Sequence, residues 1–114
     1  MEKIIYETLN EIGVPFFSQG REYIETAVKI ILERGKIGIT TELYPRIAEI
    51  YGVKPLNVER VMRHSIEMTF LNGDAKTLQR IFGNAVSYQK GKLNNSNFIY
   101  GVVKYIQVYK QGEL

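Results

Sequence analysis

The chain has 114 residues, of which 45% are hydrophobic and 24% charged, and it carries a formal net charge of +3. That length suits one domain with one core, and the lack of cysteine excludes disulfides, thiolate zinc sites and cysteine nucleophiles. The sequence shows neither a signal peptide nor an apolar run near the roughly 20 residues that span a bilayer, so we expect a cytoplasmic protein without a membrane partner.

Apolar residues recur at helical spacing in the first third of the chain. They predict one helix over residues 3–12, ended by Gly13, and a second over residues 21–34, closed by Gly35. Between them, residues 16–20 are expected to form a connection whose two phenylalanines fold back on the core. The apolar residues that mark the two helices are Ile5, Leu9, Ile12, Ile24, Ala27, Val28 and Ile31.

The stretch over residues 44–63 has the spacing of a helix-turn-helix. Its first helix, capped by Thr40 or Thr41, should stop at Gly52, because glycine adopts the left-handed conformation without steric cost. A second helix is predicted over about residues 56–71. Its inward face is expected to comprise Val58, Val61, Met62, Ser65 and Thr69. An αα-hairpin with a glycine at its turn is also common in small helical proteins, and that alternative stays open.

Two further helices are predicted in the last third of the chain. Asp74 is expected to cap a helix over residues 75–82, which Gly83 ends, and Ser96 to cap the last helix. The polar stretch between these two helices has no clear periodicity. Together the elements predict an all-α fold, a compact domain of about six helices with little or no sheet.

Polar and charged side chains cover the outward face of the second helix of the motif. They are Asn57, Glu59, Arg60, Arg63 and His64. Such groups suit the recognition of base edges and phosphates in a DNA major groove. Simpler interpretations remain open, since Glu59 and Arg63 have the i, i+4 spacing of an ordinary surface ion pair and a lone exposed His64 needs no function.

Positive charge is concentrated from this helix onward. Residues 54–92 hold seven Lys or Arg and three acidic residues, a net charge of +4, whereas residues 1–53 carry a net charge of −2. Phosphate neutralisation supplies most of the non-specific affinity for DNA, so backbone contacts are expected here, although a solvated basic face would have the same composition. The candidate phosphate or backbone contacts are Lys54, Arg63, His64, Tyr88, Lys90 and Lys92.

Five short segments of the sequence resemble the family of C-terminal DNA-binding domains of stage 0 sporulation protein A. Proteins of that name are response regulators that initiate sporulation in endospore-forming bacteria. The segments are Glu11 to Pro15, Leu43 to Ala48, Val58 to Glu67, Phe82-Gly83 with Val86-Ser87, and Asn95-Ser96 with Phe98-Ile99. The resemblance implies an all-helical domain with a helix-turn-helix. It also implies binding to a short asymmetric promoter box in double-stranded DNA, often as a tandem head-to-tail dimer.

The resemblance also implies roles for single residues. Glu59 and Arg60 would face base edges, while Arg63 and His64 would lie near the DNA backbone. Where the family has a base-reading arginine, this chain has Asn57. Asparagine prefers adenine and arginine prefers guanine, so the target sequence is expected to differ from that of the family.

A further implication of the resemblance is contact with the primary sigma factor of RNA polymerase. The surface concerned maps to Gly73, Thr77, Gln79, Phe82 and Val86. An alternative for Phe82 is that it lies half-buried at the end of its helix and has no protein partner.

Nothing in the sequence points to an enzyme. The acidic residues near the N-terminus are accompanied by no nucleophile, phosphate-binding loop or metal-ligand spacing, so catalytic, metal and cofactor sites are not expected. We expect one helix-turn-helix domain over residues 1–114 without the family's receiver domain, either free-standing or excised. The rival hypothesis is a helical protein-interaction module that no longer binds DNA, because Asn57 replaces an arginine.

Overall fold

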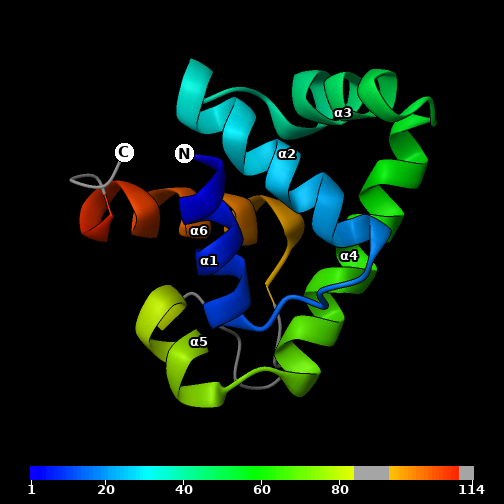
Figure 1. The fold of residues 1–114 in the computed structure, drawn as a ribbon. Coiled ribbons are helices and arrows are strands. Elements are labelled where there is room, and N and C mark those ends of the chain that lie inside the picture. Colours follow the sequence, from blue (N-terminus) through cyan, green and yellow to red (C-terminus); the bar gives the residue numbers. More distant parts are fainter. Residues whose placement is uncertain (84–92, 111–114) are drawn as a thin grey trace.

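Six α-helices and one short π-helical turn, with no strand, make up the part of the chain that the computed structural model describes, residues 1–83 and 93–110. The elements are α1 (Glu2–Ile12), α2 (Gln19–Arg34), the π-helical turn η1 (Ile39–Leu43), α3 (Tyr44–Tyr51), α4 (Pro55–Asn72), α5 (Ala75–Phe82) and α6 (Asn95–Tyr109). Helix α2 is central, since α1, α3, α4 and α6 all contact it (Figure 1). The predicted all-α fold is confirmed.

Glycine residues end four of the helices where the sequence predicted, and Gly35, which follows α2, has a φ of 85°. Gly13 and Gly52 follow α1 and α3 in the left-handed conformation, with φ of 95° and 68°. Gly83 follows α5, also with a positive φ, of 55°. The predicted cap of α5 is confirmed as well, because the Asp74 carboxylate accepts a hydrogen bond from the Thr77 N–H. These stops are local requirements of the backbone, which is why they could be predicted.

Two of the predicted helix starts are wrong by two residues. Helix α2 begins at Gln19 instead of residue 21, because the Ser18 hydroxyl lies at the N-cap position and accepts from the main chain. Helix α6 begins at Asn95 and is capped by the side chain of Asn94, not by Ser96. Asparagine caps helices as well as serine does, so composition alone could not separate the two.

The connection between α2 and α3 contains a π-helical turn that was not predicted. Thr40 and Thr41 lie inside this turn, so neither caps a helix as expected. The Tyr100 hydroxyl of α6 binds the main chain of this connection. It donates a hydrogen bond to the Ile37 carbonyl and accepts one from the Ile37 N–H. A residue of the last helix therefore fixes the approach to α3.

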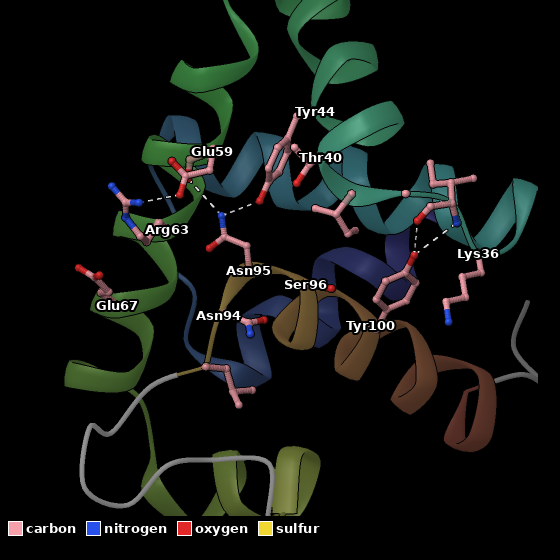
Figure 2. Close-up of a pocket in the computed structure, with 14 residues that line it drawn as sticks. Lys36, Thr40, Tyr44, Glu59, Arg63, Glu67, Asn94, Asn95, Ser96 and Tyr100 are labelled. Carbon is pink, nitrogen blue, oxygen red and sulfur yellow. Dashed lines mark hydrogen bonds and ion pairs between the residues drawn. The ribbon is translucent and has the colours of Figure 1, made fainter.

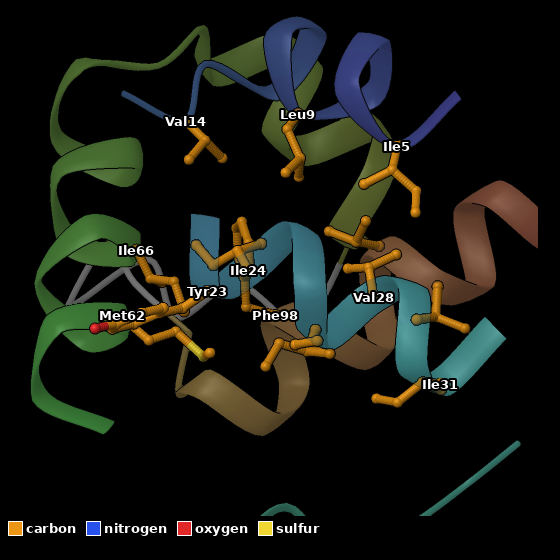
Figure 3. Packing of buried hydrophobic residues seen from close by; sticks show 14 of the residues in the cluster. Ile5, Leu9, Val14, Tyr23, Ile24, Val28, Ile31, Met62, Ile66 and Phe98 are labelled. Carbon is orange, nitrogen blue, oxygen red and sulfur yellow. The ribbon is translucent and has the colours of Figure 1, made fainter. Parts of the chain in front are cut away.

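The hydrophobic core lies between α2 and the helices that cover it (Figure 3). Tyr23 and Ile24 of α2 belong to the same buried cluster as Leu9 of α1, Met62 of α4 and Phe98 of α6. Each of these side chains is almost fully excluded from solvent. Within the described ranges, no helix is both long and apolar enough to cross a membrane.

The phenylalanines of the connection before α2 do not fold into the core, contrary to expectation. Phe17 is 95% exposed and Phe16 is 50% exposed. The buried guanidinium of Arg21 lies 5.4 Å from the centre of the Phe16 ring and donates hydrogen bonds to the carbonyls of Tyr6 and Val14. Phe16 therefore covers a buried cation at the surface, whereas the side chain of Val14, just before it, is buried in the core.

Phe82 is more deeply buried than the half-buried position predicted for it. Its side chain is 7% exposed, and its ring centre lies 5.1 Å from that of Phe98 and 5.8 Å from that of Phe70. Gly101 of α6 makes room for this ring, because a Cβ at that position would lie 2.7 Å from it. Phe82 thus anchors α5 to α6.

Candidate nucleic-acid interface

Helices α3 and α4 are joined by a connection of only three residues, 52–54. Gly52 has φ 68° and ψ 36°, and the N–H of Val53 bonds back to the Ala48 carbonyl at 3.0 Å. This is the hydrogen-bond pattern of a Schellman motif, in which an apolar residue after the glycine contacts the helix core. Val53 fulfils that role, since it is partly buried against the hydrophobic cluster. The direction in which α4 leaves α3 is therefore set by local backbone geometry.

One side of α4 is fixed against the rest of the fold. Of the predicted inward residues, Val61 is half-buried and the other four are buried, and Ile66 is a buried residue that the prediction omitted. Helix α2 crosses α4 closely, because a Cβ on Gly20 would lie 1.8 Å from the Ser65 Oγ. This close approach leaves no room for α4 to move toward α2, so its outward face has a defined position.

The predicted recognition residues are accessible on α4, where Asn57 and Arg60 line one hollow and Glu59 and Arg63 another. Asn57, Arg60, Arg63 and His64 are exposed, and Glu59 is partly exposed. Among the residues that the structure describes, neither Arg60 nor His64 forms an ion pair with a carboxylate. Their donor groups are therefore available to a ligand.

Glu59 and Arg63 form the ion pair that the sequence left open. The Arg63 guanidinium donates to the Glu59 carboxylate over 2.6 Å, and the side chains are 53% and 28% exposed, respectively. A surface pair of this kind contributes at most a fraction of a kcal/mol to stability, about 0.3–0.5 kcal/mol for i, i+4 helix pairs. Its main effect is to orient two side chains of the outward face.

Asn57 is held by a side chain from another helix. The Tyr23 hydroxyl of α2 donates a long hydrogen bond, 3.4 Å, to the Asn57 Oδ1. An amide oxygen can accept a second hydrogen bond, so Asn57 keeps both an acceptor and a donor edge for a base. Asn57 also lines a shallow hollow of about 390 Å³ together with Lys54, Leu56 and Arg60. This hollow opens beside the N-terminal end of α4.

A second hollow, of about 840 Å³, lies on another side of α4, between the 36–40 connection and the start of α6 (Figure 2). Asn95 lies at its edge and donates hydrogen bonds both to the Tyr44 hydroxyl and to the Glu59 carbonyl. Burial holds the pKa of Tyr44 above its ordinary value, so the phenol is neutral at physiological pH. Sequence reasoning assigned no role to Tyr44 or Asn95, because nothing in their local spacing indicates that they meet.

Four of the predicted contacts lie outside the described residues. They are Tyr88, Lys90 and Lys92 of the phosphate or backbone set and Val86 of the sigma-factor set. In the first set, Lys54 is exposed just before α4, next to the recognition face.

The rest of the predicted sigma-factor set is mostly buried or partly buried. Phe82 is buried, and the Thr77 hydroxyl donates to the Asp74 carboxylate that caps α5. Gly73 lies against α1, since a Cβ there would be 3.0 Å from the Ile12 carbonyl. Gln79 is the exposed member among those described.

No group of three or more potential metal-ligating side chains occurs within residues 1–83 and 93–110. Residues 5–106 match the family of sporulation initiation factor Spo0A C-terminal domains, and the match includes the whole of α3, α4 and α5. This family comprises DNA-binding transcription regulator domains of sporulation initiation and is not a family of enzymes. The chain belongs to the Spo0A C-terminal family.

Proposed function

We propose that this chain is a sequence-specific double-stranded DNA-binding domain that reads a promoter box through the N-terminal half of α4. Residues 1–114 then act as one helix-turn-helix domain on cytoplasmic DNA. The observation that carries the proposal is the outward face of α4, where exposed donors lie on a helix whose opposite side is locked into the core. A recognition helix needs both properties, because its base contacts require a defined position.

Base reading is assigned to Asn57, Glu59 and Arg60. Arg60 is exposed near the N-terminal end of α4, the part of a recognition helix that reaches base edges, and its guanidinium suits guanine. Asn57 precedes it by one turn and suits adenine. Glu59 either accepts a hydrogen bond from a cytosine amino group or, as its ion pair with Arg63 supports, holds that arginine in position.

Backbone contacts are assigned to basic residues that flank this set. Lys54, Arg63 and His64 lie on or beside the same exposed face. The basic residues Lys90 and Lys92, with Tyr88, extend the assignment along the chain. A protein that neutralises several phosphates loses affinity steeply as salt rises, with a slope of about −0.9 per phosphate on logarithmic axes.

Selection of bound sequences from random duplex DNA tests the proposal. We expect a single short asymmetric box to be enriched, and its affinity to exceed that for scrambled duplex by on the order of 10³ or more. Titration of the selected duplex at two salt concentrations should show the steep slope. Lack of enrichment together with lack of binding at low salt would refute the proposal.

A protein-interaction module is the second candidate. It is favoured by the surface aromatic group of Tyr6, Phe16 and Phe17, in which Phe17 is 95% exposed. Binding to a protein partner without any affinity for DNA would support this candidate. Contacts with the primary sigma factor and a head-to-tail dimer on DNA are proposals that follow from family membership, and Gln79 is the exposed residue with which to test the first.

A further inference from the structure

One amide side chain connects the start of α6 to both α3 and α4. The Asn95 Nδ2 donates a hydrogen bond to the Tyr44 hydroxyl of α3 over 2.9 Å and another to the main-chain carbonyl of Glu59 in α4 over 3.1 Å (Figure 2). Nδ2 carries two hydrogens, so both of its donors are used. Asn95 and Tyr44 are each only 7% exposed, so water cannot easily replace the bond between them, whereas the bond to Glu59 is partly buried.

The point of attachment on α4 lies among the proposed reading residues. Glu59 precedes Arg60, and its carboxylate pairs with Arg63 while its carbonyl accepts from Asn95. Residue 59 is thus held through both its side chain and its main chain. A bond at this carbonyl acts directly on the helical turn that presents Arg60 and Arg63.

This part of α4 has little apolar support. Over residues 55–61, Val58 is buried and Val61 partly buried, whereas Met62, Ser65, Ile66 and Thr69 bury the later turns. Side-chain packing therefore fixes the C-terminal part of α4 more firmly than its start. The hydrogen bond from Asn95 to the Glu59 carbonyl falls where few side chains are buried, and together with the long Tyr23–Asn57 hydrogen bond it helps to fix the start of the helix.

We propose that Asn95 is a positioning residue for recognition, which sets the placement of the reading face of α4 relative to α3 without touching DNA. The inference rests on the proposed function for its DNA readout but makes a separate claim about the free protein. The contact with Tyr44 and Glu59 supplies a physical role for Asn95.

The test compares Asn95→Asp with a matched control, Asn94→Asp. Both variants add one negative charge at the start of α6, and aspartate caps a helix as well as asparagine does, so the control keeps the Asn94 cap. Only Asn95→Asp removes the donor and places a carboxylate oxygen against the Glu59 carbonyl. The full chain is used, and affinities for the selected box and for scrambled duplex are measured well below both melting temperatures.

Asn94→Asp should weaken both affinities by the same factor and leave their ratio unchanged. Asn95→Asp should lower the ratio of specific to non-specific affinity by about tenfold, or about 1.4 kcal/mol. Equal ratios in the two variants would overturn the proposal. So would a fall in the melting temperature of Asn95→Asp with an unchanged ratio, because Asn95 would then serve stability alone.

Amide hydrogen exchange over residues 59–64 gives a readout that needs no DNA. We expect exchange about tenfold faster in Asn95→Asp than in Asn94→Asp, since opening of this turn would cost about 1.4 kcal/mol less. If the wild-type chain prefers no DNA sequence, the proposed function fails, and exchange alone decides on the Asn95 contact. Unchanged exchange would overturn it.

A milder pair of variants covers the case in which Asn95→Asp does not fold. Tyr44→Phe removes one acceptor of the Asn95 amide and keeps the buried ring. Its control is Tyr51→Phe, which removes a hydroxyl from the same helix that bonds to Thr26 instead. A lower specificity ratio in Tyr44→Phe than in Tyr51→Phe supports the positioning role, and identical ratios contradict it.

Discussion

Replacement of Gly52 tests whether the junction between α3 and α4 depends on its left-handed backbone. Gly52 has φ 68° and ψ 36°, and a Cβ built there would meet no atom within 4 Å. The cost of a side chain is therefore backbone strain alone, without steric contact. A non-glycine residue in this region costs about 1–2 kcal/mol, and a β-branched one more.

The magnitude follows from two opposing terms. Loss of the flexible glycine from the unfolded chain returns about 0.4–1 kcal/mol. We therefore expect Gly52→Ala to reduce the free energy of unfolding by about 1 kcal/mol and Gly52→Val by about 2 kcal/mol. For a domain of this size, a loss of about 2 kcal/mol corresponds to a melting temperature lower by roughly 8 °C.

Urea and thermal unfolding of the two variants measure these losses, with Gly52→Asn as the matched control. Asparagine tolerates the left-handed conformation, so this control should lose less than either variant. An unchanged melting temperature in Gly52→Val would show that the left-handed stop is not maintained in solution. Equal losses in all three variants would mean that the conformation of residue 52 does not determine the cost.

Three further outcomes are expected. Arg60→Ala should weaken binding to the selected box by about 1–3 kcal/mol and affect binding to scrambled duplex little, whereas Lys54→Ala should weaken binding to both duplexes alike. If Arg60→Ala weakened binding to both duplexes equally, Arg60 would contact phosphate and not a base. Asn57→Arg should shift the preference at one base pair from adenine to guanine, measured on duplexes that differ only there; identical rankings would remove Asn57 from the base-directed set. Burial raises the pKa of Tyr44, so the Tyr44 hydroxyl keeps its proton in the folded state at a pH at which the unfolded state loses it. The free energy of unfolding should therefore fall as pH rises above about 10, and it should fall less in Tyr44→Phe. Urea unfolding at about pH 9 and about pH 11 measures the difference, and parallel losses would exclude Tyr44 as its source.

Much of α4 could be predicted because its pattern is local. The spacing of apolar residues along one helix separated the buried side from Arg60 and His64, and the structure agrees. The stop at Gly52 could be predicted for the same reason, since the left-handed requirement concerns a single residue. Ile66 was missed, although its neighbours Met62 and Ser65 were assigned to the buried face.

The connections were harder to predict because hydrophobicity does not say which way a loop turns. Phe16 and Phe17 are apolar, yet both are exposed. The place of Phe16 follows from Arg21, whose guanidinium is buried because two main-chain carbonyls and Glu25 satisfy its donors. A buried arginine is rare enough that a sequence gives no reason to expect one.

The side chains that hold the candidate site in place also could not be predicted from local sequence patterns. Tyr23 is 34 residues from its partner Asn57, and Asn95 is 51 residues from Tyr44 and 36 from Glu59. Such pairs are brought together only when helices α2, α3, α4 and α6 pack. No periodicity within one helix contains that information.

Substitutions of the residues proposed to contact DNA and of the residues that hold them in place should therefore have different effects. A substitution on the outward face of α4 alters which base is contacted, and it can be recognised from the helix pattern alone. A substitution at Asn95 leaves every proposed contact residue in place, yet removes the hydrogen bond to the Glu59 carbonyl. A substitution at Tyr44 removes an acceptor of the same Asn95 amide. Proteins with the same reading face can thus differ in how firmly that face is held, and hence in specificity, since discrimination between bases depends on placement as well as on side-chain identity.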